Sequence, residues 1–127
     1  MGRPYFALMV VGAAANYDFV KQKIDFFIGQ IRDKYDFIII PDGTGDSDSF
    51  AEKYAEENGF QLKVMPKAKS STSGKAGYIQ AYDVHLHTAG YEHRGCIAFW
   101  DGHSYQTLHS QKMAACFKTP FRLVKCS

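Results

Sequence analysis

The sequence predicts an α/β fold, a Rossmann-like three-layer sandwich with a mostly parallel sheet of about five strands and about four helices. Short apolar runs alternate with helical patterns along the whole chain, which is typical of βαβ units. No linker, repeat or low-complexity segment interrupts this alternation. The 127 residues suffice for one core, so residues 1–127 are expected to form a single domain.

The first strand and helix are the clearest elements of the pattern. The apolar run Tyr5–Val11 predicts a buried strand that ends at Gly12, and Asn16 is a suitable N-cap for the helix that follows. Apolar residues recur along that helix at helical spacing: Val20, Ile24, Phe27, Ile28 and Ile31. The run Asp36–Ile40 predicts the second strand.

The middle of the chain predicts a helix and a short strand. Ser47 or Asp48 is expected to cap the helix, and Gly59 to end it. Its inward face is predicted to hold four residues: Phe50, Ala51, Tyr54 and Ala55. The segment Gln61–Met65 alternates polar and apolar residues, as a half-exposed strand does.

Four elements are predicted in the last part of the chain. A helix from Lys75 to about Ala89 ends at Gly90, and strand Cys96–Trp100 follows. A fourth helix over Tyr105–Phe117 then leads to a last strand, Phe121–Lys125. The inward face of the first of these helices is predicted to carry Ile79, Tyr82 and Leu86.

Composition narrows the class of protein. Hydrophobic residues make up 46% and charged residues 22% of the chain, which is typical of a folded globular protein. A formal net charge of +2 is too small to indicate nucleic-acid binding. Because no apolar stretch approaches the roughly 18 residues of a membrane helix, and no signal peptide is recognisable, a cytoplasmic protein without a membrane partner is expected.

Four loops are expected to meet at the carboxyl edge of the sheet, where open α/β folds bind ligands. They are Gly12–Asn16, Pro41–Ser47, Pro66–Gly74 and Asp101–Ser104. Three of them lead into helix N-termini, whose free N–H groups favour anions. The alternative is that glycine and small polar residues are there because tight turns need them.

The established phosphate motifs are absent from these loops. The stretch GAAANY lacks the spacing of a dinucleotide fingerprint, and KSSTSGKA has Lys69 at the first glycine position of a P-loop. The loop from Pro66 to Gly74 is still rich in lysine and hydroxyl residues, so it either folds over an anion or is a solvated surface loop.

The five histidines do not form a metal motif, and no catalytic residue can be assigned. His85 and His87 would point to opposite sides of a helix, and neither H-x-x-x-H nor C-x-x-C spacing occurs. Ser104 lies outside a G-x-S-x-G nucleophile elbow. We therefore expect no metal and no cofactor.

Four stretches, in order, carry a family resemblance: VVGAAANYDFV, IIIPDGTGDSDSFAEKYAEENG, GKAGYIQAYD and IAFWDGHSYQT. They resemble the SLOG superfamily of small Rossmann-like domains, especially its stand-alone YspA-like branch. That superfamily also includes the LOG-type phosphoribohydrolases and the DNA-processing protein DprA. The resemblance extends from Phe6 to Val124.

The resemblance implies a nucleotide-like ligand and a homo-oligomer, either a dimer or a tetramer. The predicted ligand-binding residues are Gly12, Gly43, Thr44, Asp48, Lys75, Gly77, Asp101, Gly102, Ser104 and Thr107. The chain departs from the family pattern at four positions that bear on ligand contact: Asp46, Gln80, Ala81 and Gln106. These replace two glycines and an Arg-Asn pair, so either the ligand differs from the family's nucleotide or the site has decayed.

Three functions are consistent with these observations. The first is non-catalytic binding of a nucleotide or nucleotide-derived small molecule, in sensing or sequestration, with Tyr78 or Tyr105 stacked on a base. The second is a nucleotide-processing hydrolase using Asp101, His103 or Asp48, although LOG-type enzymes have a glutamate after their glycine-threonine turn and LHSQK follows Thr107 here. The third is a protein-interaction module with a relic pocket, whose surface would include Tyr17, Phe26, Tyr78, Tyr82, Tyr91 and Tyr105.

Overall fold

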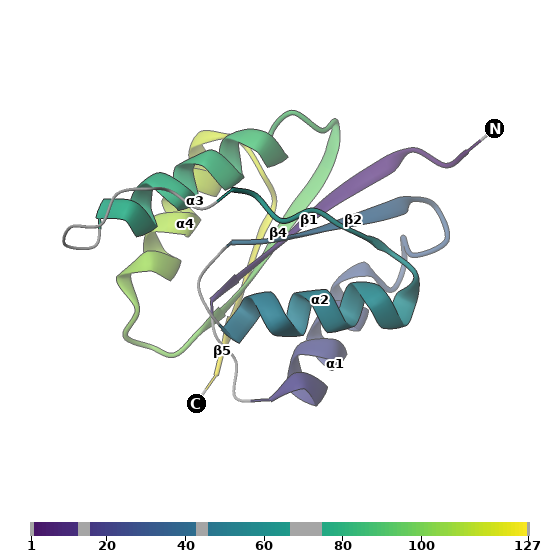
Figure 1. Ribbon diagram of the computed structural model, residues 1–127, viewed down its shortest axis with the longest axis horizontal. Helices are drawn as coiled ribbons and strands as arrows, with labels where there is room; N and C mark the ends of the chain where they lie inside the picture. Colours follow the sequence, from purple (N-terminus) through teal and green to yellow (C-terminus); the bar gives the residue numbers. More distant parts are fainter. Residues whose placement is uncertain (1, 13–15, 43–45, 67–74, 127) are drawn as a thin grey trace.

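The computed structural model describes residues 2–12, 16–42, 46–66 and 75–126, and these residues form five strands and four helices (Figure 1). The strands are β1 Tyr5–Gly12, β2 Asp36–Pro41, β3 Gln61–Leu62, β4 His93–Trp100 and β5 Phe121–Lys125. The helices are α1 Tyr17–Ile28, α2 Asp46–Asn58, α3 Lys75–Thr88 and α4 Tyr105–Cys116. All strand pairs are parallel and the sheet is open, so the predicted Rossmann-like fold class is confirmed.

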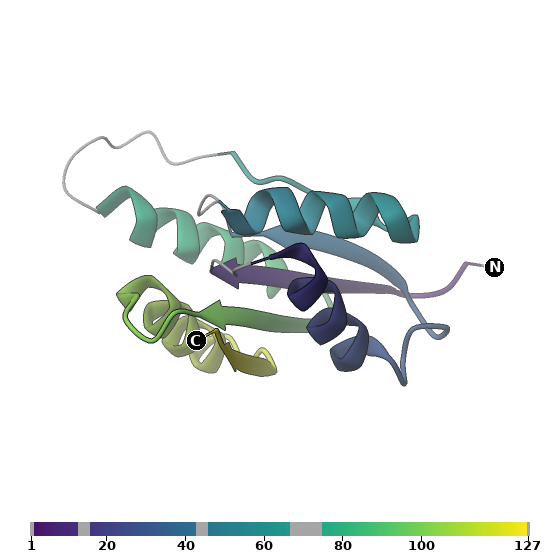
Figure 2. The same cartoon turned by 90° about the horizontal axis from the view of Figure 1, so that it is seen from below.

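The strand order β3-β2-β1-β4-β5 explains the three layers. The chain first moves outward from β1 to β3 and then returns past β1 to β4 and β5. Because parallel crossovers are right-handed, this reversal moves the later helices to the other face of the sheet. Helices α1 and α2 therefore lie on one face, and α3 and α4 on the other (Figure 2).

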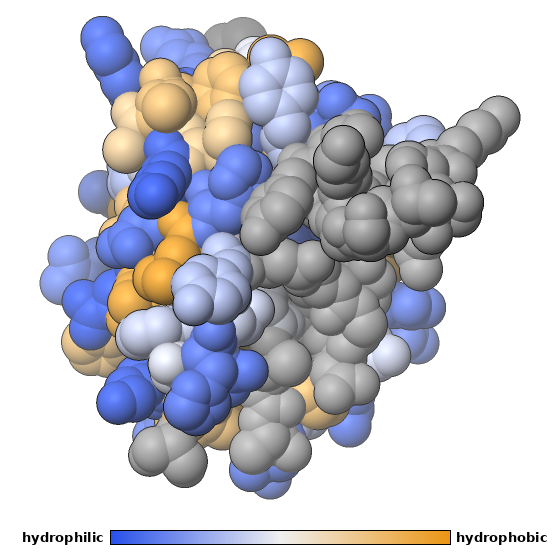
Figure 3. Space-filling model, turned by 90° about the vertical axis from the view of Figure 1, so that its left-hand side faces the viewer, coloured by the Kyte–Doolittle hydropathy of each residue, from blue (hydrophilic) through white to orange (hydrophobic). Residues whose placement is uncertain are grey.

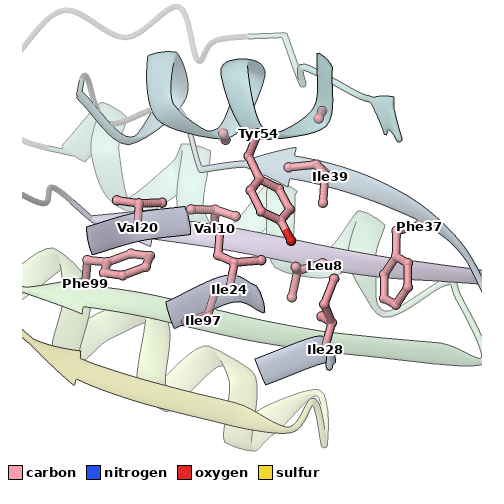
Figure 4. Packing of buried hydrophobic residues seen from close by; sticks show 12 residues of the cluster. Leu8, Val10, Val20, Ile24, Ile28, Phe37, Ile39, Tyr54, Ile97 and Phe99 are labelled. Atoms are coloured by element: carbon pink, nitrogen blue, oxygen red, sulfur yellow. The ribbon is translucent and has the colours of Figure 1, made fainter. Parts of the chain in front are cut away.

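The core beneath α1 and α2 confirms the two predicted apolar stripes. Val20, Ile24 and Ile28 of α1 are buried against Leu8 and Val10 of the central strand (Figure 4). From α2, the ring of Tyr54 enters the same layer, and its hydroxyl donates a hydrogen bond of 2.6 Å to Asp25 Oδ1. Buried apolar area of this kind is the main source of stability in such a layer.

The predicted inward face of α3 is wrong at Tyr82 and Leu86, and the side chain of Ile79, its third member, lies outside the described part. Tyr82 and Leu86 are 46% and 50% exposed, and the ring of Tyr82 packs on Phe117 with the centroids 5.9 Å apart. The described side chains that α3 buries are instead small or polar: Gln80, Ala81, Val84, His85 and Thr88. Thr88 satisfies its hydroxyl within the helix, on the carbonyl of Val84. Since α3 packs on both the sheet and α4, a face of mostly small or internally bonded side chains lets these elements approach one another.

Three predicted boundaries also differ from the structure, the first being the start of β4 at His93 rather than at Cys96. The strand expected over Gln61–Met65 is confined to Gln61–Leu62, and after Lys63 donates to the carbonyl of Ile39 the chain leaves the sheet. Residues 61–64 are all exposed at the edge of the sheet. A longer strand would therefore bury no additional apolar surface. Helix α2 begins at Asp46, which places the predicted caps Ser47 and Asp48 inside its first turn.

Among the described residues, no helix is long and apolar enough to cross a membrane.

Candidate functional site

The ends of β1 and β4 lie side by side at the carboxyl edge of the sheet, where Gly12 pairs with Phe99. Gly12 has a φ of 87°, and a Cβ on it would lie 2.1 Å from the carbonyl oxygen of Phe99. Only glycine fits this close approach of two backbones. The need for glycine at this predicted ligand residue is thus explained by strand packing alone.

Asp42 links the end of β2 to the end of β1. Its side chain is 3% exposed, and Oδ2 accepts a hydrogen bond of 3.2 Å from the amide of Gly12. Its own amide donates to the carbonyl of Val10. The sequence placed Asp42 in the predicted Pro41–Ser47 loop at the carboxyl edge, but not among the predicted ligand-binding residues. Asp42 therefore fixes the end of β1.

The turn after β4 is held by a second aspartate. Asp101 Oδ1 accepts hydrogen bonds of 2.7 Å from the amides of both His103 and Ser104. These two bonds lower the pKa of Asp101, whose carboxylate is exposed. Gly102, between them, has a φ of 91°, which side chains other than glycine rarely tolerate. Asp101 and Gly102 together shape the entry to α4.

The first turn of α4 is not capped by the side chain of its N-cap residue. Ser104 stands at the N-cap position, but its hydroxyl makes no capping hydrogen bond, and its carbonyl accepts one of 3.1 Å from Trp100 Nε1. Thr107, a predicted ligand residue, is 2% exposed, so its side chain packs inside rather than facing the carboxyl edge. The first N–H groups of α4 point past Ser104 toward this edge and favour an acceptor with negative charge.

A cation lies close to the same turn. A Cβ on Gly102 would be 3.6 Å from Cε of Lys125, at the end of β5. Sequence reasoning missed Lys125, because its nearness to Gly102 depends on the pairing of β5 with β4. The turn after β4 therefore combines an open helix terminus with a nearby ammonium group.

Other predicted residues are placed only in part. Asp48 lies in the first turn of α2, and Lys75 and Gly77 lie in the first turn of α3. The side chains of Asp48 and Lys75 are outside the described part. The first turns of these helices and of α4 lie at one edge of the sheet (Figures 1 and 2). Seen from that edge, the described surface is mostly hydrophilic with a few hydrophobic spots (Figure 3). Gly43 and Thr44 fall outside the described residues, as do residues 67–74 of the predicted lysine and hydroxyl loop.

The positions that replace the family's Arg-Asn pair point inward. Gln80 is 6% exposed and Ala81 is 7% exposed, both on the buried face of α3. Both side chains are uncharged and buried, so neither can replace the charge of the family's arginine at a ligand.

The described histidines and acids offer no metal centre. Within the described ranges, no group of three or more His, Cys, Asp or Glu side chains is close enough to hold an ion. His85 is completely buried on α3, and neither ring nitrogen has a hydrogen-bond partner among the described residues. Burial lowers the pKa of His85 to about 4, so the ring is neutral at physiological pH.

Neither a protein-family model nor a curated protein matches this chain. The resemblance to the SLOG superfamily therefore stays a prediction from the sequence.

Proposed function

We propose that this chain binds a nucleotide or nucleotide-derived small molecule at the carboxyl edge of its sheet, to sense or sequester it without catalysis. The observation that carries the proposal is the uncapped first turn of α4 directly after Gly102. The N–H groups of such a turn, together with the helix dipole, bind phosphate in many nucleotide-binding folds.

The surroundings of this turn suit the rest of a nucleotide. Lys125 supplies positive charge for the phosphate, and Lys75 begins the neighbouring helix α3. The exposed carboxylate of Asp101 can accept further hydrogen bonds from ribose hydroxyls. The ring of Tyr105 is 77% exposed in the first turn of α4, where a base can stack on it.

The same residues favour binding over hydrolysis. The two amides that lower the pKa of Asp101 make it a weak base, and at neutral pH it has no proton to donate. Thr107, which would precede the catalytic glutamate of a LOG-type enzyme, is buried and is followed by LHSQK. A phosphoribohydrolase mechanism therefore lacks its acid in this turn.

The test is a thermal-shift and native mass spectrometry panel of mono-, di- and cyclic nucleotides on the full chain and on Ser104→Asp. An aspartate at the N-cap would close the first turn of α4 and repel phosphate, so we expect at least about tenfold weaker binding. The control, Gln30→Asp, adds the same charge at an exposed position after α1 and should bind as the unmodified chain does.

Two results would overturn the proposal. One is a chain that responds to no nucleotide in the panel and retains none on purification. The other is a nucleotide that binds Ser104→Asp as tightly as the unmodified chain, which would place the ligand elsewhere.

A protein-interaction module is the second candidate, because several aromatic side chains are exposed. Phe26 is 78%, Tyr105 77% and Tyr82 46% exposed, on three different helices. Aromatic side chains are enriched where protein surfaces associate. Native mass spectrometry of the same samples reports the subunit number, and a dimer or tetramer that carries no nucleotide would favour this candidate.

A further inference from the structure

A groove of about 780 Å³ lies between α1 and the edge strand β5. It is lined by Phe19, Lys23, Phe26, Phe27, Ile97, Pro120, Phe121, Arg122, Leu123, Val124 and Lys125. Figure 2 shows that α1 crosses the middle of the sheet and leaves β5 beyond it. The groove is separate from the uncapped turn of α4, although Lys125 borders both.

Strand β5 forms one wall of the groove and is an edge strand. The amide of Cys96 donates to Pro120 at 2.8 Å, and the amide of Cys126 donates to Trp100 at 2.7 Å. In a parallel ladder these bonds direct the amides of Arg122 and Val124 toward β4. The backbone groups of Phe121, Leu123 and Lys125 then face outward, and no described strand pairs with them.

The side chains that line the groove are aromatic, aliphatic or positively charged. Phe26 stands at its rim, and Phe19, Phe27 and Val124 form much of the apolar surface. All charges in the lining are positive, since Lys23, Arg122 and Lys125 contribute ammonium and guanidinium groups and no aspartate or glutamate takes part. Arginine and aromatic residues beside an unpaired strand are typical of a protein-binding surface.

We propose that this groove binds an extended, acidic segment of another protein, which pairs with the free edge of β5 as a sixth strand. The backbone of the segment bonds to the outward groups of Phe121, Leu123 and Lys125. Its side chains on the α1 side of the sheet are both apolar and acidic: the apolar ones pack on Phe19, Phe26 and Val124, and the carboxylates pair with Lys23 and Arg122. This interaction does not depend on nucleotide binding at α4.

A second copy of this chain does not fit the same edge. Pairing of β5 with another β5 brings the cations Arg122 and Lys125 of both copies onto one short ladder, and like charges across strands are destabilising. The groove also draws on both faces of the strand, with Arg122 and Val124 on the α1 side and Phe121 and Leu123 on the other. This shape follows a strand edge rather than enclosing a compact ligand.

The test uses a short fluorescent peptide, measured by fluorescence anisotropy with the full chain. Every second residue is threonine and the residues between alternate valine and glutamate, so that valine and glutamate share one face of the strand. Two matched peptides serve as controls: one carries lysine in place of glutamate, and the other carries an N-methyl group on every residue and has no backbone N–H for strand pairing. We expect only the acidic, unmethylated peptide to bind, with affinity that falls as salt is added.

Charge reversal in the groove supplies the protein-side test. We expect Lys23→Glu/Arg122→Glu to lower the affinity for the acidic peptide at least about tenfold. The control Lys21→Glu/Lys34→Glu changes the net charge equally at exposed residues outside the lining, and should bind as the unmodified chain does. Both double variants leave the turn at Gly102 intact, so nucleotide binding can be measured on the same samples.

Three results would overturn the proposal: equal binding of the methylated and unmethylated peptides, equal binding by the two charge-reversal variants, or self-association lost in Lys23→Glu/Arg122→Glu. The proposal would also be overturned if the acidic peptide does not bind and an oligothymidylate binds tightly through Lys23 and Arg122. That outcome would assign the groove to single-stranded nucleic acid.

Discussion

Helices α1 and α4 both begin at the carboxyl edge of the sheet, on opposite faces, but their N-caps differ. Both follow central strands, β1 and β4, whose ends meet at the pair Gly12 and Phe99. At α1, Asn16 Oδ1 accepts a hydrogen bond of 2.9 Å from the amide of Phe19. At α4, the hydroxyl of Ser104 makes no such bond. One strand-to-helix connection thus closes its helix terminus, and the other leaves it available to a ligand.

The two connections also use their aspartates differently. Asp42 is buried and accepts a hydrogen bond from the amide of Gly12 in the neighbouring strand. Asp101 is exposed and accepts a hydrogen bond from the amide of His103 in its own turn. The end of β1 is therefore held by a hydrogen bond from the neighbouring strand. The turn after β4 is held by hydrogen bonds within the turn itself.

The largest expected effect is that of Gly12→Ala. The added Cβ would meet the carbonyl of Phe99 at 2.1 Å at a positive φ, so we expect a loss of about 3 kcal/mol or more in unfolding free energy. Gly59→Ala is the control, because Gly59 also has a positive φ but has nothing within 4 Å, and should cost about 1 kcal/mol. Urea unfolding measures both, and equal losses would contradict the close approach of β1 and β4.

Acid is expected to destabilise the chain through His85 before it affects Asp101. Because the pKa of His85 is lowered to about 4 in the folded state, the unfolded chain takes up the proton first. Stability should be constant above pH 6.5 and fall on the order of 3 kcal/mol between pH 6.5 and 4. Urea unfolding of His85→Leu across this range should show a clearly flatter profile, although His87, whose pKa is also lowered, leaves a weaker dependence. If the unfolding free energy of His85→Leu falls with acid as steeply as that of the unmodified chain, His85 is not the cause of the loss.

The two helix caps are compared directly by Asn16→Ala and Ser104→Ala. The first removes the bond to the amide of Phe19, so we expect a loss of about 1 kcal/mol in unfolding free energy. The second removes no capping bond and should change stability by only a few tenths of a kcal/mol. Equal losses in chemical denaturation would mean that α4 is capped in solution.

Adding a cap to α4 should stabilise the protein more than exchanging the existing cap of α1. Ser104→Asp places a carboxylate at an N-cap and should raise the unfolding free energy by about 0.5 kcal/mol. Asn16→Asp exchanges one good cap for another and should change it less. A melting curve that shows no gain for Ser104→Asp would indicate that the first turn of α4 cannot form a capping bond.

The smallest expected effect is acid titration of Asp101. Since its folded pKa lies below the usual value, its contribution is present above about pH 4 and disappears as pH falls through the lowered value. Asp101→Asn should remove the loss of unfolding free energy that occurs below pH 4. The dependence of the unfolding free energy on pH above pH 4 should not change. Chemical-shift titration of the His103 and Ser104 amides would report the same event, and amides indifferent to acid would contradict the two hydrogen bonds.

The sequence by itself determined the local elements of this protein. Strand β5 has the predicted bounds, and β1 and β2 differ from prediction by one residue at an end. The Asn16 cap and the Gly59 stop are also confirmed. Each depends on residues within one or two turns of chain, where hydrophobic period, capping chemistry and glycine conformation act directly.

Tertiary structure alone decided how those elements meet. It buries the polar side of α3, with Gln80 and His85, and leaves Tyr82 and Leu86 outside. It also brings Asp42 to the amide of Gly12. The candidate site could be predicted only as a set of turns, because whether a helix terminus is capped depends on where a single side chain forms its hydrogen bond. The groove along β5 depends on which strand is left at the edge, and that follows from pairing between strands far apart in the chain.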